Sequence, residues 1–323
     1  MPLCTKAKNN SMSKVIGIGE TVTDFIIRND QPEAMVCGGS CYNSMISIGR
    51  CGVEALFIGE VGNDRLGLRT RQMLETNGVN ADYLTLTEGK KSQLSLAFLN
   101  DRNDAEYVFY KDHASDIFPL STPVADAGDV VLYGSFYALN PVIHPALSRF
   151  LAKTEARGAI IYYDINFRAS HLADKDRISS ELLDNLNHAT IVKGSDEDFR
   201  NLFDTDDADT IYNKVGTRCD ILIITRGSGA VSIMTEGRRK DYSVEPARVV
   251  STVGAGDSFN AGFVCALVRQ GVTRSQLPNL PDETVDYLVD TATRFGREVC
   301  GTTDNYISLS TGQQFRNTSV ADS

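Results

Sequence analysis

The stretch STVGAGDSFNAGF, residues 251–263, places Asp257 ahead of apolar residues at helical spacing. Gly254 and Gly256 leave backbone N–H groups bare at the expected helix start, where the helix dipole favours an anion. A carboxylate at this place repels a bound phosphate, so its presence there calls for a chemical role. Accepting a proton from a hydroxyl is such a role. The structural alternative is an aspartate cap with small residues for close packing.

The composition indicates a globular protein that holds its ligands through local groups. The formal net charge of −10 over 323 residues argues against a sequence-independent nucleic-acid binder, which needs a basic face. Seven cysteines scattered through apolar segments predict reduced thiols and a cytoplasmic location. No apolar run approaches the roughly 18 residues of a membrane span. The polar N-terminus also lacks the apolar core of a signal peptide.

Apolar, β-branched runs alternate with amphipathic segments along most of the chain. This alternation predicts buried parallel strands covered by helices on both faces. Two period-two runs, residues 92–100 and 105–111, break the rhythm and predict a short antiparallel lid, beside which the segment near Asp24 could pair. The strands expected in the main sheet are residues 14–19, 54–62, 129–135, 159–166, 189–195 and 220–227.

The organisation predicted from these patterns is one α/β domain over residues 14–310. Its lid strands come from about residues 25–36 and 90–112, and residues 1–13 and 311–323 are expected to be polar tails. Internal repeats, low-complexity tracts and long linkers are absent from the sequence. The expected fold class is a three-layer α/β/α core with a mostly parallel sheet and a small antiparallel β lid.

Residues 251–263 resemble the C-terminal signature of the ribokinase-like (PfkB) carbohydrate kinases, DTxGAGDxFxAG. Residues 38–67 are similar to the N-terminal family block, and GETVTDFI, DINFR and TRGSGA resemble three further family segments. The resemblance covers nearly the whole chain in the right order. It implies a ribokinase-like fold and ATP- and Mg²⁺-dependent phosphorylation of a sugar hydroxyl, with a fructokinase-like acceptor as the first expectation.

The resemblance also implies a role for individual residues. Asp257 would be the general base, and the N–H groups of Gly254, Ala255 and Gly256 would form the anion hole. The acceptor side would comprise Asp24, Gly38, Gly39, Asn43, Lys111, Asn166 and Arg168, and the nucleotide side Lys193, Thr225, Gly227 and Gly229. Structural alternatives remain open for several of these: a turn aspartate at Asp24, a surface ion pair at Arg168 and a hairpin turn in TRGSG.

Three departures from the family pattern limit what the resemblance implies. The NxxE segment associated with Mg²⁺ is here SDED, residues 195–198, so oxygen ligands remain, and Asp198 is the candidate, acting through water. Ser251 replaces the acidic residue that opens the C-terminal signature, which leaves a monovalent-cation site uncertain. Lys111 stands where many relatives have an arginine, and a point charge there could alter substrate preference. A homodimer paired through the lid edge is expected from relatives.

Other function classes fit the sequence less well. The GIGETV segment resembles a dinucleotide fingerprint, but Val22 stands where the third glycine belongs. EGKKS has Leu84 at the upstream glycine position of a P-loop. A non-catalytic sugar-binding or regulatory protein on the same fold stays open, although Asp257 beside an anion hole serves catalysis rather than binding. The acceptor could also be 2-keto-3-deoxygluconate, ribose or a nucleoside.

Overall fold

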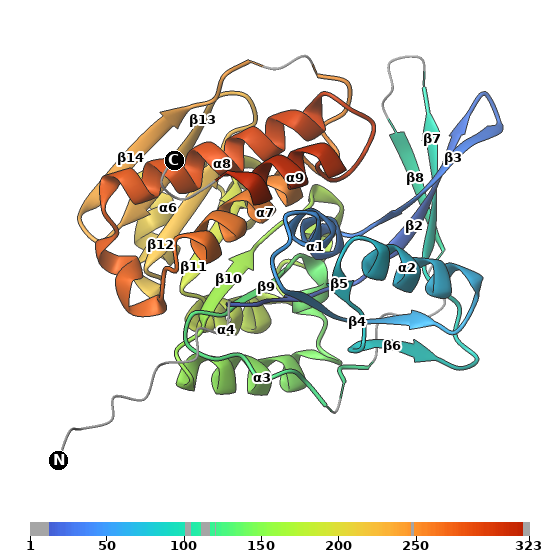
Figure 1. Ribbon diagram of the computed structural model, residues 1–323, viewed down its shortest axis with the longest axis horizontal. Helices are drawn as coiled ribbons and strands as arrows, with labels where there is room; N and C mark the ends of the chain where they lie inside the picture. The colour runs from blue at the N-terminus through green and yellow to red at the C-terminus, as the bar shows by residue number, and fades with distance from the viewer. Residues whose placement is uncertain (1–12, 101–104, 111–116, 120, 247–248, 319–323) are drawn as a thin grey trace.

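A computed structural model describes residues 13–100, 105–110, 117–119, 121–246 and 249–318 (Figure 1). Its main sheet has the strand order β14-β13-β12-β11-β10-β9-β1-β4-β5, with β6 paired to β4. Neighbours from β12 to β5 are parallel, whereas β13 and β14 are antiparallel to their neighbours. The strands are β1 (Val15–Ile18), β4 (Ala55–Gly62), β5 (Val79–Asn80), β6 (Leu84–Thr87), β9 (Val130–Gly134), β10 (Ile160–Asp164), β11 (Ile191–Ser195), β12 (Ile221–Thr225), β13 (Ala230–Thr235) and β14 (Arg238–Ser243).

Helices cover both faces of this sheet, as the alternation of apolar and amphipathic segments predicts (Figure 1). Successive strand residues point to opposite faces, so Val130 belongs to the core under α1, α7 and α8, and Val131 to the core under α3 and α4. The α-helices are α1 (Ser40–Arg50), α2 (Arg65–Thr76), α3 (His144–Ala156), α4 (Ser179–His188), α5 (Asp196–Phe203), α6 (Ala208–Val215), α7 (Ala255–Arg269), α8 (Asp282–Cys300) and α9 (Leu309–Asn317). The expected three-layer fold is thereby confirmed.

A second, smaller sheet stands beside the main one and forms the lid (Figure 1). Its order is β3-β2-β7-β8, with β2 (Val22–Arg28), β3 (Gln31–Gly38), β7 (Leu94–Leu99) and β8 (Ala105–Tyr110). The expectation of an antiparallel lid is wrong for its centre, where β2 and β7 run parallel. The chain passes through α1, β4 and α2 between these strands, and such a long crossover allows parallel pairing. Val108 and Tyr110 are exposed on the edge strand β8; the homodimer expected there remains a prediction.

The C-terminal segment differs from the expected polar tail. Residues 309–317 form α9, in which Ser308 caps the helix and Phe315 is buried. The helix was missed because only Gly312 and Phe315 of its sequence are buried, which is too short an apolar pattern to predict a helix. Arg316 fastens α9 by donating to the backbone oxygens of Arg50 and Gly49 at the end of α1.

Two further expectations concern thiols and membranes. The described cysteines, Cys37, Cys41, Cys51, Cys219, Cys265 and Cys300, are free thiols. Among the helices of the described chain, none has both the length and the hydropathy to span a bilayer.

Candidate active site

The stretch 251–263 leads into α7 and forms its first turns from Ala255 on, with Gly254 as the N-cap and Asp257 in the first turn. Gly254 has φ +80°, and a Cβ atom there would lie 2.3 Å from the carbonyl oxygen of Asn305. Both facts require glycine. The Ala255 N–H donates to the Thr252 carbonyl over 3.3 Å, so one of the three N–H groups expected in the anion hole already has a backbone partner.

The Asp257 carboxylate is held by side chains of α1. Ser40 Oγ donates to Oδ1 over 2.7 Å and Asn43 Nδ2 donates to Oδ2 over 2.8 Å. Ser44 Oγ adds a 2.8 Å bond to the Asp257 carbonyl. Burial raises the pKa of Asp257 to about 6, although the bonds from Asn43 and Ser40 oppose this shift. A carboxylate with such a pKa is ionised at neutral pH and more basic than an ordinary aspartate.

Two of the residues expected on the acceptor side, Asp24 and Asn43, lie beside Gly38, where β3 passes into α1. A Cβ atom at Gly38 would lie 3.4 Å from Asp24 Oδ2 and 3.9 Å from Asn43 Oδ1. Asn43 Oδ1 is buried and has no hydrogen-bond partner in the described part of the chain. Gly39 has φ +133° and a Cβ atom there would lie 2.4 Å from the Glu20 carbonyl oxygen, so the turn into α1 needs glycine.

Asp24 links the lid to this cluster. It lies on β2 opposite Ser95 of β7, whose hydroxyl donates to Asp24 Oδ1. Burial raises the pKa of Asp24, and the Ser95 hydrogen bond and the Arg168 charge partly offset the shift. Arg168 is exposed just after β10, close enough to act on Asp24, and Asn166 in the same segment has φ +38°.

Lys193 lies under the start of α7 in a buried polar network. A Cβ atom at Gly256 would lie 3.4 Å from Lys193 Nζ. Lys193 Nζ donates to Asp164 Oδ1 over 3.1 Å, and Asn260 Nδ2 donates to Asp164 Oδ2 over 2.6 Å. Burial disfavours the charge of Lys193, but the carboxylates of Asp164 and Asp198 raise its pKa above the ordinary value. A cation is therefore fixed beside the expected anion hole.

The other nucleotide-side residues follow β12. Thr225 ends this strand and pairs in register with Ser195 at the end of β11. Gly227 and Gly229 form the turn into β13, so the hairpin interpretation of TRGSG is correct. Gly227 has φ +52° and open space around a Cβ position. Both strands end at the sheet edge where β10 ends, the usual place for ligands in open α/β sheets.

Asp198 has a structural task that limits its use as a metal ligand. Its Oδ1 accepts from the Phe167 N–H over 2.7 Å, and its Oδ2 accepts from the N–H and the hydroxyl of Ser195 over 2.6 and 2.8 Å. The bond from the Ser195 N–H, together with the bond from the Asp198 N–H to Ser195 Oγ, forms a capping box at the start of α5. No cluster of three or more His, Cys, Asp or Glu suited to a metal occurs within the described residues. Both Asp198 oxygens already accept from protein donors, so direct binding of Mg²⁺ by this carboxylate would compete with these bonds.

Four residues with contacts in the site were not singled out from the sequence: Ser40, Asp164, Asn260 and Asn305. The first three stand inside the motifs that carry the resemblance, so their polar character was a usable signal. Asn305, in the loop between α8 and α9, had no such signal. Lys111, expected on the acceptor side, lies outside the described residues.

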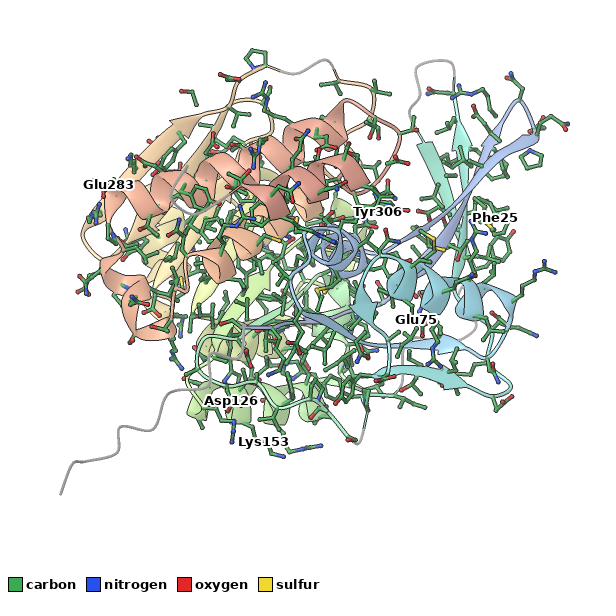
Figure 2. All side chains as sticks on the ribbon, in the orientation of Figure 1. Phe25, Glu75, Asp126, Lys153, Glu283 and Tyr306 are labelled. Atoms are coloured by element: carbon green, nitrogen blue, oxygen red, sulfur yellow. The ribbon has the colours of Figure 1, made fainter. Side chains whose placement is uncertain are left out.

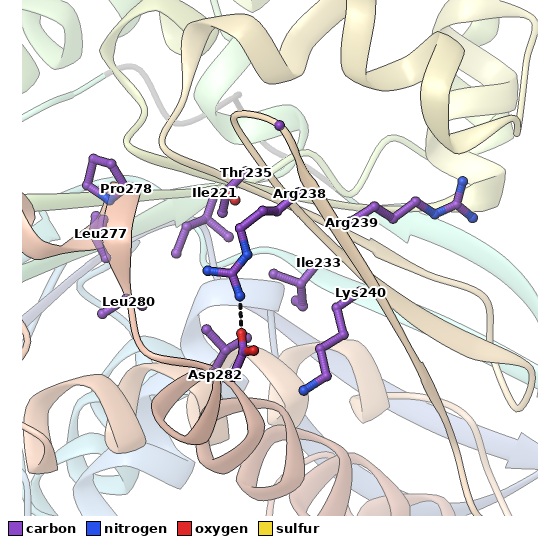
Figure 3. A pocket seen from close by; sticks show the side chains of 12 residues that line it. Ile221, Ile233, Thr235, Arg238, Arg239, Lys240, Leu277, Pro278, Leu280 and Asp282 are labelled. Atoms are coloured by element: carbon purple, nitrogen blue, oxygen red, sulfur yellow. Dashed lines mark hydrogen bonds and ion pairs between the residues drawn. The ribbon is translucent and has the colours of Figure 1, made fainter.

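A cavity of about 360 Å³ lies at the other end of β12, away from this site (Figure 3). Its floor is apolar, and Arg238, Arg239 and Lys240 of β14 stand around it. Each of these cations is ion-paired, Arg238 with Asp282 at the start of α8. The size of a cavity alone does not mark the active site, because the family signature residues, Asp257 with its bonds from Ser40 and Asn43, lie elsewhere.

The chain belongs to the PfkB family of carbohydrate kinases, whose family model matches residues 12–311. It is 29% identical over 280 residues to probable fructokinase-4 of Arabidopsis thaliana, which covers 81% of this chain and 84% of that protein. It is 26% identical over 272 residues to the fructokinase of Escherichia coli, with 82% and 87% covered.

Solved structures show the same fold. The fructokinase of Vibrio cholerae O395 with fructose, ADP and calcium bound has a TM-score of 0.81 at 22% identity, covering 95% of this chain and 100% of that chain. The aminoimidazole riboside kinase of Salmonella enterica, complexed with aminoimidazole riboside and an ATP analogue, has a TM-score of 0.80 at 21% identity, with 94% and 100% covered. The protein is thus a carbohydrate kinase, a phosphotransferase with an alcohol group as acceptor.

Proposed function

We propose that this kinase transfers the γ-phosphoryl group of ATP to a sugar hydroxyl, with fructose as the first acceptor and Asp257 as the general base. The observation that carries the proposal is the Asp257 carboxylate, held at the start of α7 by Ser40 and Asn43 with a pKa of about 6. Fructose is the first acceptor because curated relatives at 25–29% identity are named fructokinases.

Each group around Asp257 has a task in this proposal. Asp257 takes the proton from the acceptor hydroxyl. The hydroxyl oxygen attacks the γ-phosphorus of ATP, and the bond from that phosphorus to the oxygen of the leaving ADP breaks. The N–H groups of Gly254 and Gly256 and the ammonium of Lys193 stabilise the charge on the transferring group, and the Ala255 N–H joins them once it releases the Thr252 carbonyl. Asp24, Gly38, Gly39, Asn43, Asn166 and Arg168 bind the sugar, and Thr225, Gly227 and Gly229 face the nucleotide.

Magnesium would enter with the nucleotide. When bound, Mg²⁺ neutralises charge on the phosphate oxygens. In this chain Asp198 would orient a water of the ion rather than bind it directly, because protein donors already occupy both of its oxygens. Closure of the lid over the sugar would exclude water and keep ATP hydrolysis slow in the absence of an acceptor.

The test is coupled ADP release with Mg²⁺ and ATP over fructose, ribose, 2-keto-3-deoxygluconate, tagatose, fructose phosphates and adenosine. Adenosine stays in the panel because a riboside kinase matches the fold as well as a fructokinase does. Fructose-dependent turnover supports the proposal. Turnover only on another acceptor changes the substrate, and nucleotide binding without turnover on any acceptor favours the non-catalytic alternative.

A further inference from the structure

Three polar atoms from distant parts of the chain surround the space that Gly38 leaves open. A Cβ atom at Gly38 would lie 3.4 Å from Asp24 Oδ2, 3.5 Å from Asn305 Nδ2 and 3.9 Å from Asn43 Oδ1. Two of these atoms are hydrogen-bond acceptors and one is a donor. Because glycine has no side chain, the Cβ position itself is empty, and a group of methyl or hydroxyl size there would contact all three atoms without a clash.

The chemistry of the three atoms fits one ligand group. Asn43 Oδ1 is buried without a partner, and a buried acceptor that stays unpaired costs about 1–3 kcal/mol. Asp24 uses Oδ1 for the Ser95 hydroxyl, which leaves Oδ2 for the ligand. A hydroxyl donates one hydrogen bond and accepts others, so it can satisfy an acceptor of this set and the Asn305 donor together. An ammonium cannot accept from Asn305, and a methyl group satisfies none of the three atoms.

Asn305 is fixed in this position by its own backbone. Its carbonyl oxygen would lie 2.3 Å from a Cβ atom at Gly254, so the residue packs on the N-cap of α7. The next residues are tied to α1, since Arg50 donates to the Ile307 carbonyl and lies over the Tyr306 ring. Tyr306 lies on the side of the C-terminal helices that faces the lid (Figure 2). Asn305 is only 7% exposed, so its amide lies among buried groups rather than in bulk solvent.

We infer that Asn305 is an acceptor-binding residue that donates to one hydroxyl of the sugar, while that hydroxyl donates its proton to one of the two facing acceptors, Asp24 Oδ2 or Asn43 Oδ1. The inference rests on the proposed function, because it assigns a further residue to the same sugar pocket. It makes the loop between α8 and α9 part of substrate selection, in addition to the lid and α1. The loop also contacts Gly254, so it packs against both the proposed sugar pocket and the expected anion hole.

The experiment compares wild type and Asn305→Ala on the acceptor that wild type phosphorylates and on the monodeoxy analogues of that acceptor. Loss of one neutral hydrogen bond predicts a roughly 3- to 15-fold rise in the acceptor KM, with kcat and the ATP KM within about 2-fold. For one analogue only, the loss in binding caused by the substitution and the loss caused by removing the hydroxyl should not add up, because both remove the same hydrogen bond. Thr303→Ala, exposed in the same loop, is the matched control and should behave as wild type.

Asn305→Asp separates recognition from folding, because it keeps the size of the side chain and replaces the donor with an acceptor beside Asp24. It should raise the acceptor KM more than Asn305→Ala does. An unchanged acceptor KM in both variants, or losses that add for every analogue, would overturn the inference while the proposed function stands. If wild type phosphorylates no acceptor, the proposed function fails; calorimetric binding of the same sugars to wild type and Asn305→Ala then decides, and equal binding overturns the inference.

Discussion

Helices α7 and α8 both have an aspartate in the first turn, yet the two helix starts differ in what surrounds that aspartate. Asp257 of α7 is held by two side chains of α1, beside a buried lysine and an acceptor without a partner. Asp282 of α8 is exposed and ion-paired with the exposed Arg238 at the cavity of Figure 3. The first arrangement leaves polar atoms for a ligand, whereas the second satisfies its charges internally. Matched substitutions at the two places test this difference.

The largest effect is expected at the two aspartates. Asp257→Asn keeps the shape but cannot accept the proton, so kcat should fall by about 10²- to 10⁴-fold with a smaller change in KM. Asp282→Asn removes only an exposed ion pair and should leave kcat unchanged. Steady-state ADP release from both variants is the measurement. Near-normal turnover by Asp257→Asn would remove the distinction between the two helix starts.

The next comparison is between Lys193, beside the start of α7, and Lys240, at the cavity of Figure 3. Lys193→Met removes the cation beside Gly256 and should lower kcat/KM by about 10²- to 10³-fold, the effect of losing a transition-state donor. Lys240→Met, at an exposed ion pair with Asp286, should leave kcat/KM unchanged. Lys193→Met also leaves the buried Asp164 charge without its cation, with only the Asn260 hydrogen bond remaining, which destabilises the fold. The double variant Lys193→Met/Asp164→Asn should recover thermal stability but not rate; recovery of both would make Lys193 a structural residue.

Replacing a glycine of positive φ should cost more unfolding free energy at the start of α7 than in the turn beside the cavity of Figure 3. Gly254→Ala meets a left-handed backbone and the Asn305 carbonyl at 2.3 Å, and we expect a loss of about 2–4 kcal/mol in unfolding free energy. Gly237→Ala in the turn between β13 and β14 has φ +71° but open space, so about 1 kcal/mol is expected. Urea unfolding of both variants measures this. Equal losses would mean that the contact with Asn305 relaxes without cost.

The smallest effect is a shift in pH dependence. Ser40 donates to the Asp257 carboxylate and lowers its pKa, so Ser40→Ala should move the acid limb of kcat/KM to higher pH and change the rate little above pH 8. Ser44 donates to the Asp257 carbonyl instead, so Ser44→Ala should leave the limb in place. The pH profiles of both variants are compared with that of wild type. A limb that moves equally in both would show a general effect of α1 rather than a bond to the base.

Much of the fold could be predicted because its signals are local. The central strands are buried on both faces, so their apolar runs indicated a parallel sheet, and Gly254 before an apolar stripe indicated the start of α7. The lid was harder, because the parallel pairing of β2 with β7 depends on a crossover rather than on either strand sequence. Helix α9 was missed because it buries few of its residues.

The candidate site likewise has a part that could be predicted from the sequence and a part that could not. Motif residues could be predicted one by one, but their contacts could not, because Ser40 and Asp257 are 217 positions apart in the sequence. Only folding brings α1 onto α7 and shows that Ser40 donates to the expected base. Asn305 illustrates the limit, since nothing in its neighbourhood of the sequence indicates a ligand and its position depends on contacts with Gly38 and Gly254.

The most direct test of Asp257 as the base is the pH dependence of kcat/KM for wild type on its best acceptor. This quantity reports ionisation in the free enzyme. The base must be deprotonated to act, so kcat/KM should fall tenfold per pH unit below an apparent pKa of about 6, the value that burial gives Asp257. A profile that stays level down to pH 4.5, in protein that remains folded, would contradict the assignment of Asp257 as general base.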